Sequence, residues 1–206
     1  MRLRLKYGFP TLAQMTPEEF ADAKSLWKFF YANECFKHVE NACSFILQSG
    51  MDEKHPAYFP LITAIYVLYG KPFKSSRVVG KLSKEFVPPK FRELHDLMIM
   101  HRDQLYAHTD AHNFDDPFPG VPNQVRVRRV SSEARMIGTE FYARPPVLPH
   151  VIALCREMQK KTSYHINKLQ NRHFKKHLPK GPGEYPINVF NMAGPFFLPK
   201  QPPFEP

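Results

Sequence analysis

Three residues near the middle of the chain combine the side-chain types that phosphodiester cleavage needs. Arg102 and Asp103 are adjacent, and His108 follows after four further residues. Histidine titrates near neutral pH and can take up or give a proton, whereas arginine stays charged and offers parallel N–H donors to a phosphate. Attack by a ribose 2′-hydroxyl requires a proton acceptor, a proton donor for the leaving oxygen, and positive charge against the phosphorane. These residue types therefore suit RNA cleavage.

The segment that holds these residues has a helical pattern. Apolar and then histidine-rich positions recur at steps of three and four, namely Phe91, Leu94, Met98, His101, Leu105, His108 and His112. Pro88 and Pro89 suit the start of a helix, and the proline- and glycine-rich segment 113–122 cannot continue one. The pattern predicts a helix over about 89–108, with boundaries good to a few residues.

The spacing of the candidate residues has a geometric consequence. On one helix, a separation of six residues gives a rise of about 9 Å and directions about 120° apart. Arg102 and His108 of one chain would then not point at the same phosphate. Two such helices paired across a two-fold axis would bring both residues of both subunits into one basic cleft, so we expect a homodimer. Asp103 is a candidate to orient a histidine or to hold Arg102.

The stretch RDQLYAHTD, residues 102–110, resembles the motif of the HEPN superfamily. That motif has an arginine, a polar residue, a short spacer and a histidine, often preceded by a small residue such as Ala107. The resemblance is closest to abortive-infection HEPN proteins and covers about residues 75–110. It implies an all-α bundle, a two-fold dimer with facing motifs, and a metal-independent endoribonuclease in phage defence or a toxin–antitoxin system, with an antitoxin or defence partner. Some relatives carry a modified tyrosine where this chain has Asp110.

Other interpretations of the same residues stay open. The charged groups can be capping and ion-pair groups, with His108 stabilised by the negative end of the helix dipole. His101, His108 and His112, with four nearby aspartates, are possible metal ligands, but no HExxH pattern occurs and we expect no metal and no cofactor. Arg172 and His177 form a second pair with similar spacing. The alternative function is a catalytically inactive HEPN-like module that binds RNA or protein.

The composition indicates one basic domain with a real core. The chain has 206 residues, 43% of them apolar, and carries a formal charge of +10, which favours encounters with phosphate polymers or anionic surfaces. Cys35, Cys43 and Cys155 lie in apolar helical patterns without CxxC spacing, which predicts reduced thiols that pack in the core. No apolar run has the length of a signal peptide or a membrane span, so we expect a cytoplasmic protein without a membrane partner.

The first long helix has clear start and stop signals. Thr16, Pro17 and Glu19 fit a capping box, and Gly50 fits a helix end. The segment between them is either one helix of about thirty residues or two helices joined near Asn33. Its predicted apolar face, including an aromatic stripe expected in the core, comprises Phe20, Ala23, Trp27, Phe30, Phe36, Val39, Cys43, Ile46 and Leu47.

The other helices complete the predicted all-α, HEPN-like bundle. Segment 58–69 is apolar on nearly all sides and should be the central buried helix, whereas segment 75–86 should be a short amphipathic helix. Pro145 and Pro146 precede the last long helix. Its predicted apolar face is Val147, Val151, Leu154, Met158, His165 and Leu169.

Two further features accompany the predicted helices. A small β-hairpin is predicted at about 124–143, where Arg126, Arg128 and Arg129 are candidate substrate-binding residues for a phosphate backbone. An exposed ribbon kept soluble by its charge is an equally good interpretation. Residues 1–178 then form the helical domain. Residues 179–206, with eight prolines and several aromatic residues, should form an extended strap across an apolar groove of this subunit or of a partner.

Overall fold

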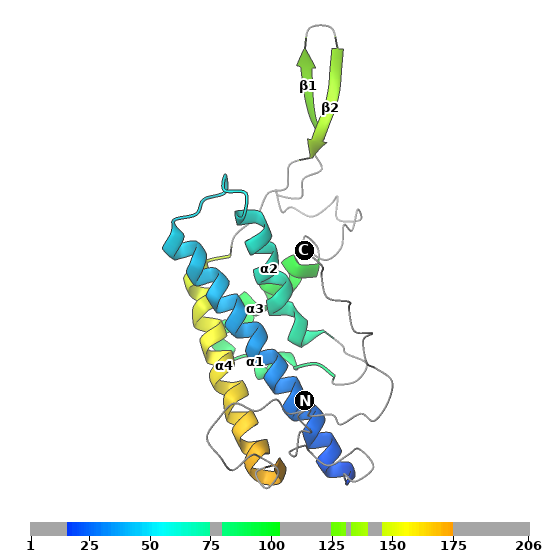
Figure 1. Ribbon diagram of the computed structural model, residues 1–206, viewed down its shortest axis with the longest axis vertical. Coiled ribbons are helices and arrows are strands. Elements are labelled where there is room, and N and C mark those ends of the chain that lie inside the picture. The colour runs from blue at the N-terminus through cyan, green and yellow to red at the C-terminus, as the bar shows by residue number, and fades with distance from the viewer. Residues whose placement is uncertain (1–15, 75–79, 104–124, 131–132, 140–145, 175–206) are drawn as a thin grey trace, which may run out of the picture.

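The computed structural model describes residues 16–74, 80–103, 125–130, 133–139 and 146–174. These residues contain four α-helices and one two-stranded ribbon (Figure 1). The helices are α1 (Pro17–Ser49), α2 (Tyr58–Gly70), α3 (Arg92–His101) and α4 (Leu148–Leu169). The described part of the chain is therefore mainly α-helical, and none of its helices combines the length and the apolar character needed to cross a bilayer.

The longest helix, α1, is one uninterrupted helix of 33 residues. The predicted capping box is confirmed: the Thr16 backbone N–H donates to Glu19 Oε2 at 3.0 Å, and the Glu19 backbone N–H donates to Thr16 Oγ1 at 3.2 Å. The helix ends at Gly50, whose φ of 63° lies in the left-handed region that favours glycine. Local sequence therefore specifies both ends of α1, and no break occurs near Asn33.

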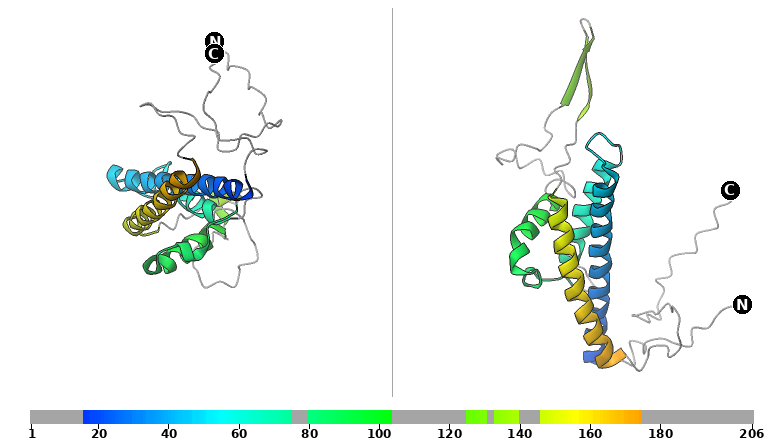
Figure 2. Two further views of the ribbon diagram at one scale, coloured as in Figure 1. Left: turned by 90° about the horizontal axis from the view of Figure 1, so that it is seen from below. Right: turned by 90° about the vertical axis from the view of Figure 1, so that its left-hand side faces the viewer.

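Helices α1 and α4 lie side by side and run antiparallel (Figures 1 and 2). Polar contacts join them at several levels. Glu40 accepts hydrogen bonds from Arg156 Nε and Gln159 Nε2, both at 2.7 Å, and Thr162 Oγ1 bonds Asn33 Oδ1 at 3.1 Å. Because Thr162 is fully buried, its hydroxyl needs such partners, and it also bonds the Met158 carbonyl of its own helix.

Helix α2 packs against α1 on one side and α3 on another. It is the buried helix that its continuous apolar pattern predicts, with Ile62, Ile65, Tyr66 and Tyr69 fully buried. The core around it also contains Phe36, Val39, Val87, Met98, Leu154 and Met158. Cys35, Cys43 and Cys155 are free and buried, as predicted, and burial raises the pKa of the Cys43 thiol to about 12. These thiols are packing groups.

The prediction of which residues of α1 are buried is partly wrong. Trp27, Phe30 and Leu47 were expected in the core but are 37%, 39% and 49% exposed. The buried residues of this helix are Ala23, Leu26, Ala32, Cys35, Phe36, Val39, Cys43 and Ile46. Apolar residues occur on more than one side of α1, and α2 and α4 cover only the side that faces them, so periodicity alone could not select the buried face.

Other boundaries differ from the predictions in the described residues. The amphipathic helix predicted at 75–86 is absent from residues 80–86, which carry only a 3₁₀ turn at Lys84–Phe86. Helix α3 starts at Arg92, after a 3₁₀ turn at Pro89–Phe91, and the predicted continuation beyond Asp103 lies outside the described residues. Of the predicted face of α4, Val151, Leu154 and Met158 are buried as expected. Val147, the residue that caps the start of α4, is 59% exposed, and Ile166 is buried instead. The predicted C-terminal strap also lies outside the described residues.

The ribbon consists of β1 (Val125–Val130) and β2 (Glu133–Thr139), paired antiparallel. The register is irregular between Arg126 and Val127. Figure 1 shows the ribbon away from the helical bundle, beyond the end of the bundle at which α2 begins. The strands fall within the segment for which alternating residues predict a hairpin.

Candidate functional site

The candidate arginine lies directly after α3. Arg102 keeps helical backbone angles, and its N–H donates to the carbonyl groups of Met98 and Ile99. Its side chain is 19% exposed, so most of it is covered by protein. The Nε atom is buried and has no hydrogen-bond partner among the residues that the structure describes. The guanidinium group is therefore held close to the protein and does not extend into solvent.

An ion-pair cluster fixes the head group of Arg102. Asp103 accepts a hydrogen bond from Arg102 Nη1 on Oδ1 at 2.6 Å and one from Lys74 Nζ on Oδ2 at 2.5 Å. Partial burial by itself would raise the pKa of Asp103, but the bonds from Lys74 and Arg102, together with their charges, lower it below its usual value. The carboxylate stays ionised at neutral pH. Two cations share one anion, which leaves a net positive charge in the cluster.

The stem of Arg102 packs against the last residue of α2. A Cβ atom on Gly70 would lie 3.0 Å from Arg102 Cδ and 3.1 Å from Cγ. Such distances are shorter than normal van der Waals contact between carbon atoms, so the side chain has this path only because position 70 has no side chain. Lys74 and Gly70 were missed by the sequence analysis. Neither belongs to a motif, and Lys74 is 29 residues from Asp103.

Two histidines of α3 are part of the core. His95 Nδ1 shares a hydrogen bond of 2.8 Å with the Tyr69 hydroxyl, and His101 Nδ1 shares one of 3.1 Å with the Tyr66 hydroxyl. His95 and His101 are 4% and 5% exposed. Each imidazole thus pairs with a buried tyrosine of α2. This arrangement links α3 to α2 and gives His101 a structural role.

The metal interpretation gains no support from the part of the chain that the structure describes. Residues 16–74, 80–103 and the later described ranges contain no group of three or more histidine, cysteine or acidic side chains arranged to hold a metal ion. The other residues considered for that site, His108, His112 and the aspartates from Asp110 onward, lie outside the described ranges.

The remaining candidate residues are only partly placed. His108, the predicted proton-transfer group, lies outside the described residues. In the ribbon, Arg126 pairs with Gly138, Arg128 with Arg135, and Arg129 with Ala134. Arg128 and Arg135 therefore occupy opposite positions on neighbouring strands.

The second arginine–histidine pair has a different environment. Arg172 contacts Glu18 at 3.2 Å and Asp22 at 3.4 Å, and these contacts join the end of α4 to the start of α1. Its side chain is 56% exposed, so each contact adds little to stability. His177 lies outside the described residues. Arg172 is thus an interhelical ion-pair residue.

No family model, curated protein or solved structure matches this chain.

The buried His95 predicts a pH dependence of stability. Burial lowers the pKa of His95 below its ordinary value of 6.5; the charge of Asp96 opposes this shift and that of Lys84 adds to it. The unfolded chain then binds more protons than the folded one below about pH 6.5. The contribution of His95 to the free energy of unfolding should therefore be complete above that pH and should be lost as the pH falls through the folded-state pKa. Urea denaturation at several pH values between 5 and 7.5 measures the slope.

His95→Gln is the matched variant for this measurement. Its amide can still bond the Tyr69 hydroxyl but does not titrate. We expect a shallower dependence of stability on pH in this variant. An unchanged slope would assign the effect to other groups, such as His165, whose pKa is also lowered, first by burial and then by Lys168, Lys161 and Lys28.

Proposed function

We propose that this chain is a metal-independent endoribonuclease of HEPN type that acts as a homodimer. Arg102 would stabilise the charge of the phosphorane, and His108 would transfer a proton to or from the reacting oxygens. The carrying observation is the held guanidinium: Asp103 bonds its Nη1 at 2.6 Å, and the side chain keeps 19% of its surface exposed. A cation held in place at a partly open position is what phosphate recognition needs.

The cluster around Arg102 supports this role in two ways. Lys74, 40% exposed, adds a second cation close to the same carboxylate and can attract a phosphate from solvent. Asp103, anchored by both cations, limits the rotation of the guanidinium, so less conformational entropy is lost when a substrate binds. The overall charge of +10 is consistent with a phosphate polymer as substrate.

A second candidate is a catalytically inactive HEPN-like module that binds RNA or protein. One observation favours it: Arg102 is four-fifths buried and already paired with Asp103. An arginine in this state can serve folding alone, as a link between α3 and the end of α2. The ribbon, with Arg128 opposite Arg135, would then be the RNA-binding element.

A cleavage assay in a chelator separates these functions. We expect the full chain to cleave RNA in EDTA, because histidine and arginine supply the proton transfer and the charge. The products should carry 2′,3′-cyclic phosphate and 5′-hydroxyl ends, since the 2′-hydroxyl attacks and the 5′-oxygen leaves. His108→Ala should lower the rate by about 100-fold or more. His150→Ala, at an exposed position in the first turn of α4, is the matched control.

Each other result has a defined meaning. Cleavage that survives in His108→Ala contradicts the proposed chemistry, and loss of cleavage in EDTA favours a metal-dependent reaction. RNA binding without cleavage by the unaltered chain supports the second candidate.

A further inference from the structure

A line of partly or fully exposed side chains runs along the outer side of α1, and we call it the outer stripe. Its positions alternate in steps of four and three, the spacing of a coiled-coil seam. None of its members belongs to the buried face that packs against α2 and α4. The outer stripe comprises Phe20, Lys24, Trp27, Tyr31, Glu34, His38, Asn41 and Phe45.

Aromatic rings dominate the middle of the outer stripe. Trp27 and Tyr31 stack with their ring centroids 5.3 Å apart and their planes within 3°, and they are 37% and 38% exposed. Phe30, next to them, is 39% exposed, and Lys24 lies 4.5 Å from the ring centroid of Phe20. Tryptophan and tyrosine at the centre of a patch, with charged residues around them, are typical of binding hot spots.

The charges of the outer stripe are arranged symmetrically. Lys24 and Glu34 lie at equal distances along the helix from Phe29, on opposite sides of the Trp27–Tyr31 pair. If two α1 helices pack antiparallel about that point, Lys24 of each copy faces Glu34 of the other, and Trp27 faces Tyr31. A parallel arrangement would place like charges opposite each other, which is unfavourable. Glu34 also has an intrachain contact of 3.8 Å with Lys37, but both side chains are more than half exposed, so this contact is weak.

We propose that the outer stripe is a two-fold symmetric dimer interface, in which α1 packs antiparallel against α1 of a second copy of this chain. The occupant is a second copy because the part of the stripe from Phe20 to His38 is complementary to itself when reversed: each copy supplies one cation, one anion and the matching aromatic pair. An interface related by a two-fold axis requires this self-complementarity. The stacked rings would form its centre and the two Lys24–Glu34 pairs its rim.

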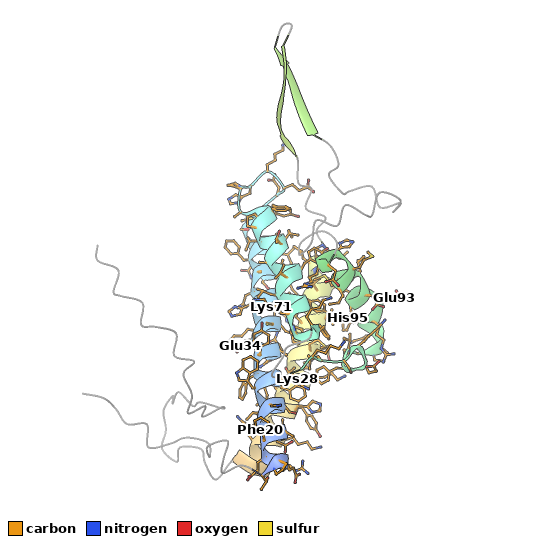
Figure 3. The ribbon with its side chains drawn as sticks, turned by 90° about the vertical axis from the view of Figure 1, so that its right-hand side faces the viewer. Phe20, Lys28, Glu34, Lys71, Glu93 and His95 are labelled. Carbon is orange, nitrogen blue, oxygen red and sulfur yellow. The ribbon has the colours of Figure 1, made fainter. Side chains whose placement is uncertain are left out.

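The outer stripe lies near the candidate site but does not depend on the nuclease proposal. Cys35 lies one helical turn from Tyr31 and interacts with the Tyr31 hydroxyl group. The charges of Lys71 and Glu34 also act on the Cys35 thiol. Figure 3 shows Phe20, Lys28 and Glu34 in order along α1, with Lys71 next to Glu34. Lys71 directly follows Gly70, which the side chain of Arg102 contacts. Because the outer stripe contains neither Arg102 nor His108, a dimer formed through it can exist whether or not the chain cleaves RNA.

Charge reversal on the full-length chain tests this interface. By symmetry, Lys24→Glu creates two like-charged pairs per dimer, and so does Glu34→Lys. We expect the unaltered chain to be a dimer by sedimentation velocity, and each single reversal to weaken dimerisation by about 10-fold or more. The double variant, with both reversals, should restore the affinity to near that of the unaltered chain. Glu53→Lys and Lys54→Glu carry the same charge changes at exposed positions in the loop after α1, outside the outer stripe, and should leave the dimer intact.

Trp27 supplies an independent signal because it is the only tryptophan of the chain. Its fluorescence should become less accessible to acrylamide as the concentration rises and dimers form. A chain that is monomeric at all concentrations overturns the proposal. If Trp27 of that monomer is also shielded from acrylamide, a segment of the same chain covers the outer stripe. A dimer that neither single reversal weakens also overturns it, because the two chains then associate elsewhere. If His108→Ala loses RNA cleavage but still forms the dimer, the result supports the proposed function and does not test the dimer interface.

Discussion

Replacing Arg102 with alanine should lower the rate of RNA cleavage by about 100-fold or more, the loss typical when one donor that stabilises transition-state charge is removed. The variant lacks both the charge and the paired N–H donors, while Asp103 keeps Lys74 as a partner at 2.5 Å. Arg102→Lys should retain part of the rate, because lysine keeps the charge but cannot bind phosphate in a bidentate manner. Single-turnover cleavage of a labelled RNA by each variant measures the effect.

Two comparisons distinguish a role of Arg102 in catalysis from a role in folding. Arg172→Ala removes an arginine of the other arginine–histidine pair, whose contacts are to Glu18 and Asp22, and it should leave cleavage unchanged. Gly70→Ala keeps Arg102 but places a Cβ atom 3.0 Å from its Cδ, so the side chain must shift and the rate should fall. If Arg102→Ala unfolds at a much lower denaturant concentration while its cleavage rate per folded molecule is unchanged, Arg102 is only a structural residue.

The largest expected change in stability is that of Phe36→Ala. Phe36 is fully buried, and its ring centroid lies 5.9 Å from that of Tyr69 and 6.1 Å from that of Phe73. Removal of the ring leaves a cavity between α1, α2 and the turn after α2. The free energy of unfolding should fall by about 3–5 kcal/mol, the range for phenylalanine-to-alanine changes in cores. Equilibrium denaturation in urea measures it.

Phe45→Ala is the matched control on the same helix. Phe45 is 53% exposed, so its loss should cost less than about 1 kcal/mol when the chain is monomeric. Equal losses of stability in the two variants would contradict the assignment of Phe36 to the core and Phe45 to the surface of α1.

Features that depend on neighbouring residues were predictable from the sequence. Thr16 and Glu19 specify the start of α1, and Gly50 specifies its end, because the capping bonds and the left-handed turn involve residues only a few positions apart. The buried helix α2 followed from its continuous apolar run. The choice of Arg102 and Asp103 as candidate residues also came from a local motif, and the structure places these two in contact.

Contacts between distant residues were decided by the tertiary structure. Lys74 meets Asp103 across 29 residues and Tyr66 meets His101 across 35, and no local pattern contains either pair. The same is true of the buried face of α1: its sequence offers several apolar sides, and only the packing of α2 and α4 determines that Phe36 is buried while Trp27 is exposed. Helical periodicity shows which residues share a side of one helix, but the free energy gained by burial depends on which other helices cover that side.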